Sequence, residues 1–414
     1  MLQNQKKPGV RILKFRIPKF CICPSCGKKQ RFKKKSENWK TVKDINSEKE
    51  IVFKIRTVYA KCLNQDCSVK YFALPTPGIE RYARVTNRLK EECINSLVKG
   101  NDTFLSVSDR LTRSFNTSGS KSSIDRWKHK EADKYNAKEI ITKLEFSEIL
   151  SLDAWKPQRS KTYNLLDSDA VKGRLLYVDN LPTMGAGYVE KHLRKLKKWG
   201  IIPRVIIVDL WKGFLRPIKR VFPDSIIQYD FYHVMKQIHW YLHRALTDYR
   251  KSLKEQGNDI LASELWEHKW LILKNMEKWT LEQHKTVESL MQTYKGTIIE
   301  DIFILKEQVR SIFDYTNSIE EAYAKREQLA IDGWQYKSNY FRSLLRFLFG
   351  KYFPYMIAFL GHKDKHIPRA GNSETMIEVF RRMERPRYGF KTQKGRLNHL
   401  KLYQINHYLN GKLD

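Results

Sequence analysis

The segment from residue 205 to residue 233 places one carboxylate after each of two β-prone runs. The run Val205–Val208 ends at Asp209, and a second apolar run leads to Asp230. An amphipathic segment lies between them, so the periodicity predicts a strand, a helix and a second strand. Ligands and catalytic groups collect at the carboxyl ends of strands in open α/β sheets, although Asp209 could instead only cap the following helix.

A further carboxylate, Asp153, follows alternating apolar residues upstream. Strand-like runs at 162–167 and 174–178 come next, and an amphipathic helix over 185–200 leads to the strand that ends at Asp209. Three strands, helix, strand, helix, strand is the ribonuclease H-like order, in which the first and fourth strands are adjacent. We therefore expect Asp153 and Asp209 to lie together. Paired carboxylates select hard ions such as Mg²⁺ or Mn²⁺, and two such ions can support phosphodiester chemistry.

Cysteine thiols form a second set of candidate metal ligands, because five of the six cysteines lie near the amino terminus. Cys23 and Cys26 are separated by two residues and followed by glycine, which is typical of a zinc knuckle. Cys62 and Cys67 form the matching pair, with β-prone flanks. Two such pairs on two hairpins predict a four-cysteine zinc ribbon. Ordinary free cysteines are the alternative, and Cys21 could replace one of the four ligands.

The charge of the chain indicates its partner. The 414 residues include 78 Lys and Arg against 45 Asp and Glu, a net charge of +33, and residues 28–54 are especially rich in lysine, as in a solvated loop or basic hairpin. This excess favours a polyanion, bound with a steep dependence on salt. No run of 18 apolar residues and no signal peptide is visible, so we expect a cytoplasmic, nucleoid-associated protein without a membrane partner.

Residues 106–132 predict two helices joined by a short turn that contains Gly119, with Val107 and Leu111 on one face of the first helix. This is the helix-turn-helix arrangement, although any two helices joined by a turn would look similar. The charge and the zinc ribbon favour the DNA-binding interpretation. Its expected DNA-facing residues are Ser122, Ser123, Arg126 and Lys128.

The carboxyl-terminal segment offers a third acidic group. Residues 234–365 have helical patterns throughout, and Asn372 or Ser373 then caps a new helix with Glu374 in its first turn. Alone, Glu374 could be a surface residue favoured by the helix dipole. The end of this helix is interpreted as a face that binds the DNA backbone. Its basic residues are Arg381, Arg382, Arg385 and Arg387.

Taken together, these segments resemble the DDE transposases of bacterial insertion sequences, specifically the ISL-three type. The resemblance covers nearly all the chain in the order of the family, and no single motif would suffice. It implies a ribonuclease H-like fold with an all-helical insertion between the second Asp and the Glu. The matching segments are CPSCG with CLNQDC, SIDRW, LSLDAW, VIIVDLWKGF, YDFYHVMKQI, FILKEQVRSIF and GNSETMIEVFRRMERPRYGF.

The resemblance also implies roles for single residues. The catalytic triad of the family corresponds here to Asp153, Asp209 and Glu374, which would bind two Mg²⁺ or Mn²⁺ ions, while the cysteines would bind a structural Zn²⁺. Asp230 and His233 are similar to the Asp/Cys-x-x-His element of related transposases. In those proteins this element supports the active site and contacts DNA rather than ligating the catalytic metal.

Two features depart from the family pattern. Ala154 follows the first aspartate where an acidic residue is common, so Asp167 is the substitute for Asp153. The second cysteine pair has a wider gap than usual. Glu378, one turn along the same helix face, is the fallback for Glu374.

The sequence thus predicts a multidomain α+β and α/β protein. We expect a DNA transposase that binds terminal inverted repeats as a homodimer or higher assembly on double-stranded DNA, and that cleaves and transfers strands. The alternatives are a catalytically inactive, transposase-derived DNA-binding regulator and a ribonuclease H-like nuclease that does not join strands. The expected domains are a basic arm and zinc ribbon (1–78), a helix-turn-helix domain (79–144), the first part of the catalytic core (145–233), the all-helical insertion (234–366), and the final part of the core with the basic tail (367–414).

Overall fold

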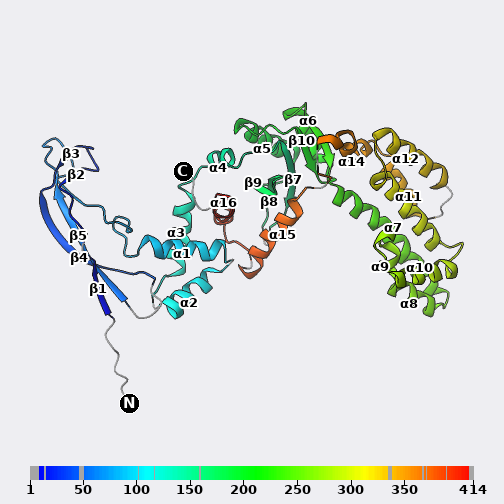
Figure 1. Cartoon of the computed structure of the whole chain (residues 1–414), viewed down its shortest axis with the longest axis horizontal. Helices are drawn as coiled ribbons and strands as arrows, with labels where there is room; N and C mark the ends of the chain where they lie inside the picture. The colour runs from blue at the N-terminus through cyan, green and yellow to red at the C-terminus, as the bar shows by residue number, and fades with distance from the viewer. Residues whose placement is uncertain are drawn as a thin grey trace, which may run out of the picture. The chain divides into compact units, whose positions relative to one another are not determined.

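The chain forms two compact units in the computed structural model (Figure 1). The terminal unit combines residues 1–143 with 380–414, and the central unit contains residues 144–379. Residues 380–414 therefore group with the amino-terminal part, whereas the sequence interpretation assigned them to the catalytic core. The structure describes residues 9–13, 15–45, 51–100, 102–115, 117–157, 160–333, 338–365, 368–369, 371–387 and 389–409.

The central unit is a mixed α/β fold built on a five-stranded mixed sheet with the order β11-β10-β7-β8-β9. β7, β8 and β9 are antiparallel, whereas β10 lies parallel to both β7 and β11. The predicted adjacency of the first and fourth strands is therefore confirmed. The strands are β7 (Ile149–Trp155), β8 (Tyr163–Asp169), β9 (Arg174–Leu181), β10 (Val205–Val208) and β11 (Ile226–Tyr229).

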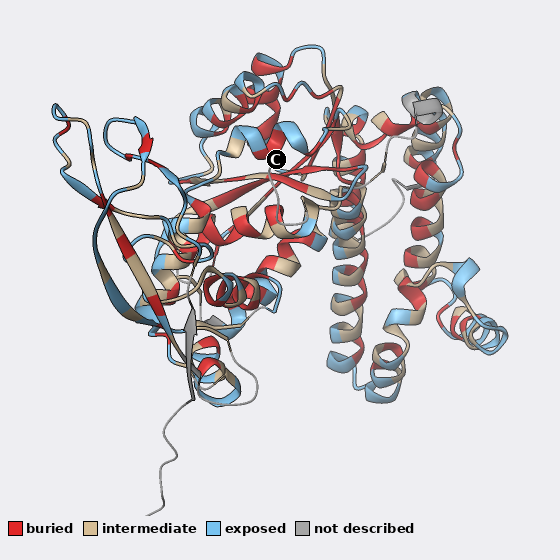
Figure 2. Ribbon diagram, turned by 60° about the vertical axis from the view of Figure 1, so that its left-hand side comes forward, coloured by how far each residue is buried: buried red, intermediate tan, exposed pale blue. Residues whose placement is uncertain are grey.

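The middle of this sheet is apolar on both faces. All four residues of β10 are fully buried, and the strands are mostly red in Figure 2. A continuous β-branched run is typical of a strand that is covered on both sides. The connecting helices, close to their predicted ranges, are α5 (Ala186–Lys198), the 3₁₀ turn η1 (Lys212–Phe214) and α6 (Leu215–Val221).

A long helical region separates β11 from α15 (Ser373–Glu384), the helix in which the boundary between the two units falls. It begins with α7 (Phe231–Glu255), which starts directly after Asp230 and leads from the sheet toward the shorter helices (Figure 1). Among the helices of the described residues, none is long and apolar enough to cross a membrane. The following elements are α8 (Asp259–Glu267), α9 (Lys269–Leu273), η2 (Met276–Lys278), α10 (Leu281–Thr293), α11 (Ile298–Asp314), α12 (Ile319–Gly333), α13 (Asn339–Leu348), α14 (Phe353–Met356), η3 (Ala358–Lys365) and α15 (Ser373–Glu384).

The terminal unit contains a small sheet and a hairpin. β1 pairs in parallel with β5, and β5 pairs antiparallel with β4 and β6, so much of the lysine-rich segment forms a long hairpin (Figure 1). β2 and β3 form a separate antiparallel hairpin. The strands are β1 (Gly9–Leu13), β2 (Phe20–Ile22), β3 (Lys29–Arg31), β4 (Lys34–Val42), β5 (Ile51–Lys61) and β6 (Tyr71–Ala73).

Helices complete the terminal unit, and its final helix packs on α3. The Lys401 ammonium donates to the carbonyl oxygens of Ala132 and Tyr135 at 3.0 and 3.1 Å, and the Asn398 amide nitrogen lies 2.9 Å from Nδ1 of His129. These contacts explain why residues 380–414 group here. The helices are α1 (Asn87–Val98), α2 (Phe104–Phe115), α3 (Lys121–Ala132), α4 (Ala137–Lys143), η4 (Arg385–Arg387) and α16 (Gln393–Tyr408).

Candidate functional site

Three aspartates follow one row of paired residues in the central sheet. In the parallel registers Leu152 pairs with Val208, and Val208 pairs with Tyr229. The next residue on each strand is Asp153, Asp209 or Asp230. Because residues in one row of a sheet point to the same face, this register places the three carboxylates at neighbouring positions.

Glu374 joins this sheet through a network of hydroxyl groups. Ser373, the first residue of α15, has its Oγ 2.5 Å from Oγ of Ser151 on β7 and 3.3 Å from Oγ of Ser168 on β8. The Asn372 side chain accepts a hydrogen bond from Ser168 Oγ at 3.0 Å and donates to the Asp169 carbonyl at 3.2 Å. The amino terminus of α15 is therefore fixed on the strand that carries Asp153.

Gly371 allows this close approach. A Cβ atom at this position would come within 2.9 Å of the Ser151 Cβ and still closer to its Oγ. The backbone N–H of Gly371 donates to Oδ2 of Asp230 at 3.0 Å, while Oδ1 of Asp230 accepts from the N–H of Tyr232 at 2.8 Å. Asp230 thus caps α7 and also connects the start of α7 to the segment before α15.

The carboxylates affect one another electrostatically. Asp153 is only 6% exposed, and burial raises its pKa to about 7, although the Ala154 N–H that it accepts opposes the rise. The charges of Asp209, Glu374 and Asp230 raise this pKa further, in that order. Burial is thus the main cause of the raised pKa, and three neighbouring carboxylates add to it.

His233 lies beside the carboxylates of Asp153 and Glu374. A ring nitrogen of His233 and carboxylate oxygens of Asp153 and Glu374 all lie within 4.8 Å of one another, close enough to hold one metal ion. Asp209 is not in this group of described residues. Burial raises the pKa of Asp209, and the charge of His233 opposes that rise, so Asp209 is also near the imidazole.

Asp209 also makes a local contact. Its Oδ1 accepts a hydrogen bond from the N–H of Trp211 at 2.8 Å, just before η1. This contact closes a short turn and is not the helix cap considered from the sequence, because Trp211 and Phe214 are the N-cap residues of η1 and α6 and neither helix has a side-chain cap. It leaves the other carboxylate oxygen of Asp209 for another partner. A local turn contact and a position in the acidic row therefore coexist at Asp209.

Asp167, the substitute considered for Asp153, belongs to a different cluster. It pairs with Leu152 rather than with Asp153, so it points to the opposite face of the sheet. Its carboxylate lies 2.9 Å from Nε2 of His192, whose Nδ1 lies 3.1 Å from Asp179. Burial alone would lower the pKa of His192, but the charge of Asp167 and the hydrogen bonds to both carboxylates raise it to about 9.

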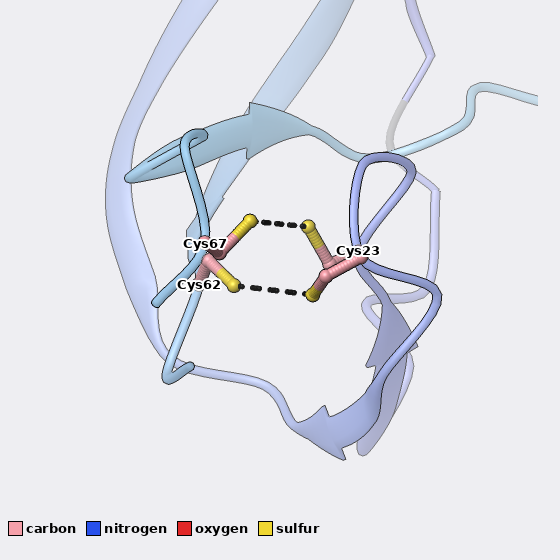
Figure 3. A group of neighbouring side chains, drawn as sticks. Cys23, Cys62 and Cys67 are labelled. Atoms are coloured by element: carbon pink, nitrogen blue, oxygen red, sulfur yellow. Dashed lines mark hydrogen bonds between the residues drawn. The ribbon is translucent and has the colours of Figure 1, made fainter. Parts of the chain in front are cut away.

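The four predicted cysteine ligands come together in the terminal unit. The sulfur of Cys23 lies 3.8 Å from that of Cys67 (Figure 3). The sulfur of Cys26 lies 3.8 Å from that of Cys62. A tetrahedron with Zn–S bonds of about 2.3 Å has edges of about 3.8 Å. The four thiols therefore form a possible zinc site. Cys21 is buried outside this group, so the alternative in which it replaces a ligand is not supported.

Two turns position these thiols. The first follows β2, where the N–H of Gly27, with φ of 68°, donates to the Cys23 carbonyl at 2.9 Å. The second lies between β5 and β6, where the N–H of Cys62 donates to the Lys70 carbonyl at 2.9 Å. The wider spacing of the second pair is accommodated because Asn64 makes a short turn, accepting from the N–H of Cys67 at 3.3 Å.

The predicted helix-turn-helix residues do not all lie at the surface. α2 ends at Phe115 and α3 begins at Lys121, where the Ser120 hydroxyl caps α3 by accepting from the N–H of Ser123. Ser122 and Arg126 are exposed, and Ser123 is half-buried. Lys128 is only 1% exposed: its ammonium lies 3.0 Å from the Asp125 carboxylate and 3.5 Å from the Gly395 carbonyl. The expectation that Lys128 faces DNA is therefore wrong.

The candidate basic face lies around the end of α15. Arg381 and Arg382 are exposed on that helix, and Arg385 is exposed in η4. The side chain of Arg387 lies outside the described residues. Because neighbouring exposed guanidinium groups are suited to phosphate, these positions remain candidates for contacting a DNA backbone.

A comparison with protein families adds an independent finding. Residues 150–393, more than half of the chain, match a family model described as a transposase. The chain belongs to the ISL-three type of the DDE transposases. The resemblance recognised from the sequence motifs is thereby confirmed. Among proteins with curated descriptions, no similar sequence is found.

Proposed function

We propose that this transposase binds the terminal inverted repeats of its element and catalyses metal-dependent DNA cleavage and strand transfer with Asp153, Asp209 and Glu374. The observation that carries the proposal is the acidic row at the ends of β7 and β10, with the first turn of α15 hydrogen-bonded to β7. Membership of the family supplies the general role, and these residues supply a place for the chemistry.

In this proposal the central unit is a ribonuclease H-like core, interrupted by an all-helical insertion from α7 to η3. The sheet order, with β10 beside β7, supports the core assignment. The run of helices between β11 and α15 supports the insertion. The terminal unit then carries the zinc ribbon and the helix-turn-helix.

The residues of the acidic row fit a divalent ion. Several carboxylates share a largely buried place. Burial and, to a smaller extent, the charges of the neighbouring carboxylates raise the pKa of Asp153, and a bound cation would offset both effects. Carboxylate oxygens favour Mg²⁺ or Mn²⁺. A pair of these ions, when bound, activates the attacking oxygen and stabilises the leaving oxygen of a phosphodiester.

The protein groups mainly position the reactants. Asp230 uses its two oxygens to hold the N–H groups of Tyr232 and Gly371, so it orients α7 and the approach to α15. In the first reaction, water cleaves the phosphodiester at the element end and leaves a 3′-hydroxyl. In the second, this hydroxyl attacks a phosphodiester of the target and releases its 3′-oxygen. Alignment of these groups lowers both barriers.

Recognition of the element ends is proposed for the terminal unit. Ser122 and Arg126, exposed on α3, are suited to base and phosphate contacts, and the net charge of +33 favours a DNA partner. The four thiols, with zinc bound, would stabilise the turns after β2 and β5. Because both ends of the element must be held at once, we expect at least a dimer on DNA.

The test is cleavage of labelled duplexes that carry the DNA flanking this gene, with Mg²⁺ or Mn²⁺. Asp209→Asn keeps an oxygen that can accept from the Trp211 N–H but removes the charge, so specific nicking should fall by at least about 10²-fold. Asp224→Asn is the matched control because Asp224 is exposed, in the turn before β11, and should retain activity.

The products distinguish the proposal from its alternatives. Nicks at the element boundary that EDTA and Asp209→Asn abolish, followed by joined products with target DNA, support it. Tight binding without metal-dependent cleavage would instead identify a DNA-binding regulator. Cleavage without joined products would identify a nuclease.

A further inference from the structure

His233 places a nitrogen donor beside the carboxylates of the acidic site. It occupies the first turn of α7, three residues after Asp230. One of its ring nitrogens lies within 4.8 Å of carboxylate oxygens of Asp153 and Glu374, and those oxygens lie equally close to each other. Three donors from β7, α7 and α15 thus surround one point, although they come from widely separated parts of the sequence.

The imidazole has an unused bonding position. Nδ1 of His233 is buried and has no hydrogen-bond partner among the described residues. A buried polar atom without a partner is costly, so native structures usually pair such atoms with protein, water or an ion. A cation held between the imidazole and the two carboxylates would give a ring nitrogen of His233 a partner and offset the charges of Asp153 and Glu374.

Unlike the His233 Nδ1, both carboxylate oxygens of Asp230 have hydrogen-bond partners. One of its oxygens accepts from the N–H of Tyr232 and the other from the N–H of Gly371. Both contacts are with backbone, so Asp230 fixes the start of α7. Since α7 carries His233, these contacts also fix the helical turn that presents the imidazole.

We propose that His233 is a direct nitrogen ligand of a divalent ion held by Asp153 and Glu374. The inference rests on the proposed function, because it concerns the metal of the same site. It differs from the role that the family resemblance implied, in which the histidine supports the site and contacts DNA. A nitrogen donor disfavours Mg²⁺, which prefers oxygen, relative to Mn²⁺. The site should therefore bind Mn²⁺ more tightly than Mg²⁺.

The test measures the metal environment and does not depend on catalysis. Full-length protein with its zinc retained, no DNA and no histidine tag is loaded with less than one equivalent of Mn²⁺. Pulsed electron paramagnetic resonance then detects ¹⁴N coupling from a ligating imidazole. We expect this coupling in the wild-type protein and its loss in His233→Asn, with affinity for Mn²⁺ weakened at least about 10-fold.

Matched variants make the result specific. His239→Asn, six residues further along α7, should retain the coupling. His233→Asp supplies an oxygen in place of nitrogen, so it should retain Mn²⁺ while losing the ¹⁴N signal, which controls for misfolding of His233→Asn. Asp153→Asn should weaken Mn²⁺ binding and so identify the site that is being observed.

The outcomes separate this inference from the proposed function. Mn²⁺ that binds in an Asp153-dependent way without ¹⁴N coupling would overturn the role of His233 and leave the acidic metal site intact. Binding that Asp153→Asn does not weaken, or no binding, would overturn both. Coupling that persists in His233→Asn but disappears in His239→Asn would show that His239 supplies the nitrogen ligand. This result would also overturn the inference.

Discussion

Oγ of Ser151 and Oγ of Ser373 lie 2.5 Å apart, although 222 positions separate these residues in the sequence. Ser151 precedes Asp153 by two residues, and Ser373 immediately precedes Glu374. A strand and a helix from distant parts of the chain are thus joined next to two of the proposed catalytic carboxylates. The position of Glu374 depends on this junction.

Gly371→Ala should disrupt the junction. The added Cβ would meet the Ser151 side chain, so we expect a loss of about 1–3 kcal/mol in the free energy of unfolding of the central unit and reduced cleavage. Urea unfolding and the duplex cleavage assay measure the two effects. Gly187→Ala is the control, because a Cβ there meets nothing within 4 Å, and an alanine inside α5 should be neutral or slightly stabilising. Equal effects of the two substitutions would contradict the close-approach argument.

Zinc should be retained or lost according to which cysteine is changed. Cys26→Ser removes one of the four gathered thiols, so elemental analysis should find much less than the one zinc per chain expected for a four-cysteine site. Binding to element ends should weaken as the turns after β2 and β5 loosen. Cys21→Ser should keep its zinc because Cys21 is buried outside the group. Loss of zinc from Cys21→Ser would show that the ligand set is different.

Arg126 and Lys128 should behave differently on substitution, although both were expected to face DNA. Arg126→Ala removes an exposed guanidinium from α3, so affinity for the element ends should fall by about 1–3 kcal/mol without loss of stability. Lys128→Ala removes a buried ammonium, which should cost about 1–3 kcal/mol in unfolding free energy. DNA titration at several salt concentrations and urea unfolding separate the two effects. A purely DNA-binding defect in Lys128→Ala would contradict the buried assignment.

The buried His192 should make the stability of the central unit depend on pH. The folded-state pKa is about 9, above the ordinary value of 6.5, so the stabilisation is fully present below about pH 6.5 and is lost as the pH rises through 9. His192→Gln should therefore lower the unfolding free energy by about 3 kcal/mol at pH 6 and by much less near pH 10. Urea unfolding of both proteins at the two pH values measures this difference. A pH-independent difference would indicate that the imidazole is neutral in the folded protein.

The core of the central unit could be predicted from the sequence because each of its strands and helices has a local sequence pattern. The continuous apolar run of β10 and the amphipathic α6 identify themselves within a few residues, and parallel pairing then brings Asp209 beside Asp153. The hydroxyl network at Ser168 and Ser373 could not be predicted in this way. It joins residues whose types are common at any surface, and only the folded backbone brings them together.

Two differences between the sequence interpretation and the structure have identifiable physical causes. Lys128 lies four residues after Ile124 and four before Ala132, and all three are buried on one face of α3. The helical period therefore contained the signal for its burial, but its charge was taken as evidence of exposure. The grouping of residues 380–414 with the terminal unit had no local signal, because the contacts of Asn398 and Lys401 are made with residues far away in sequence.

The interrupted terminal unit has a consequence for the order in which the protein is made. Synthesis of the central unit is finished before α16 emerges, yet α16 supplies the carbonyl of Gly395 to Lys128 and the Lys401 ammonium to the end of α3. On the ribosome, the central unit can thus fold before α3, the candidate DNA-binding helix, gains its contacts with α16. We expect a nascent chain to acquire its full affinity for DNA only after α16 has emerged, when the acidic residues have already been assembled.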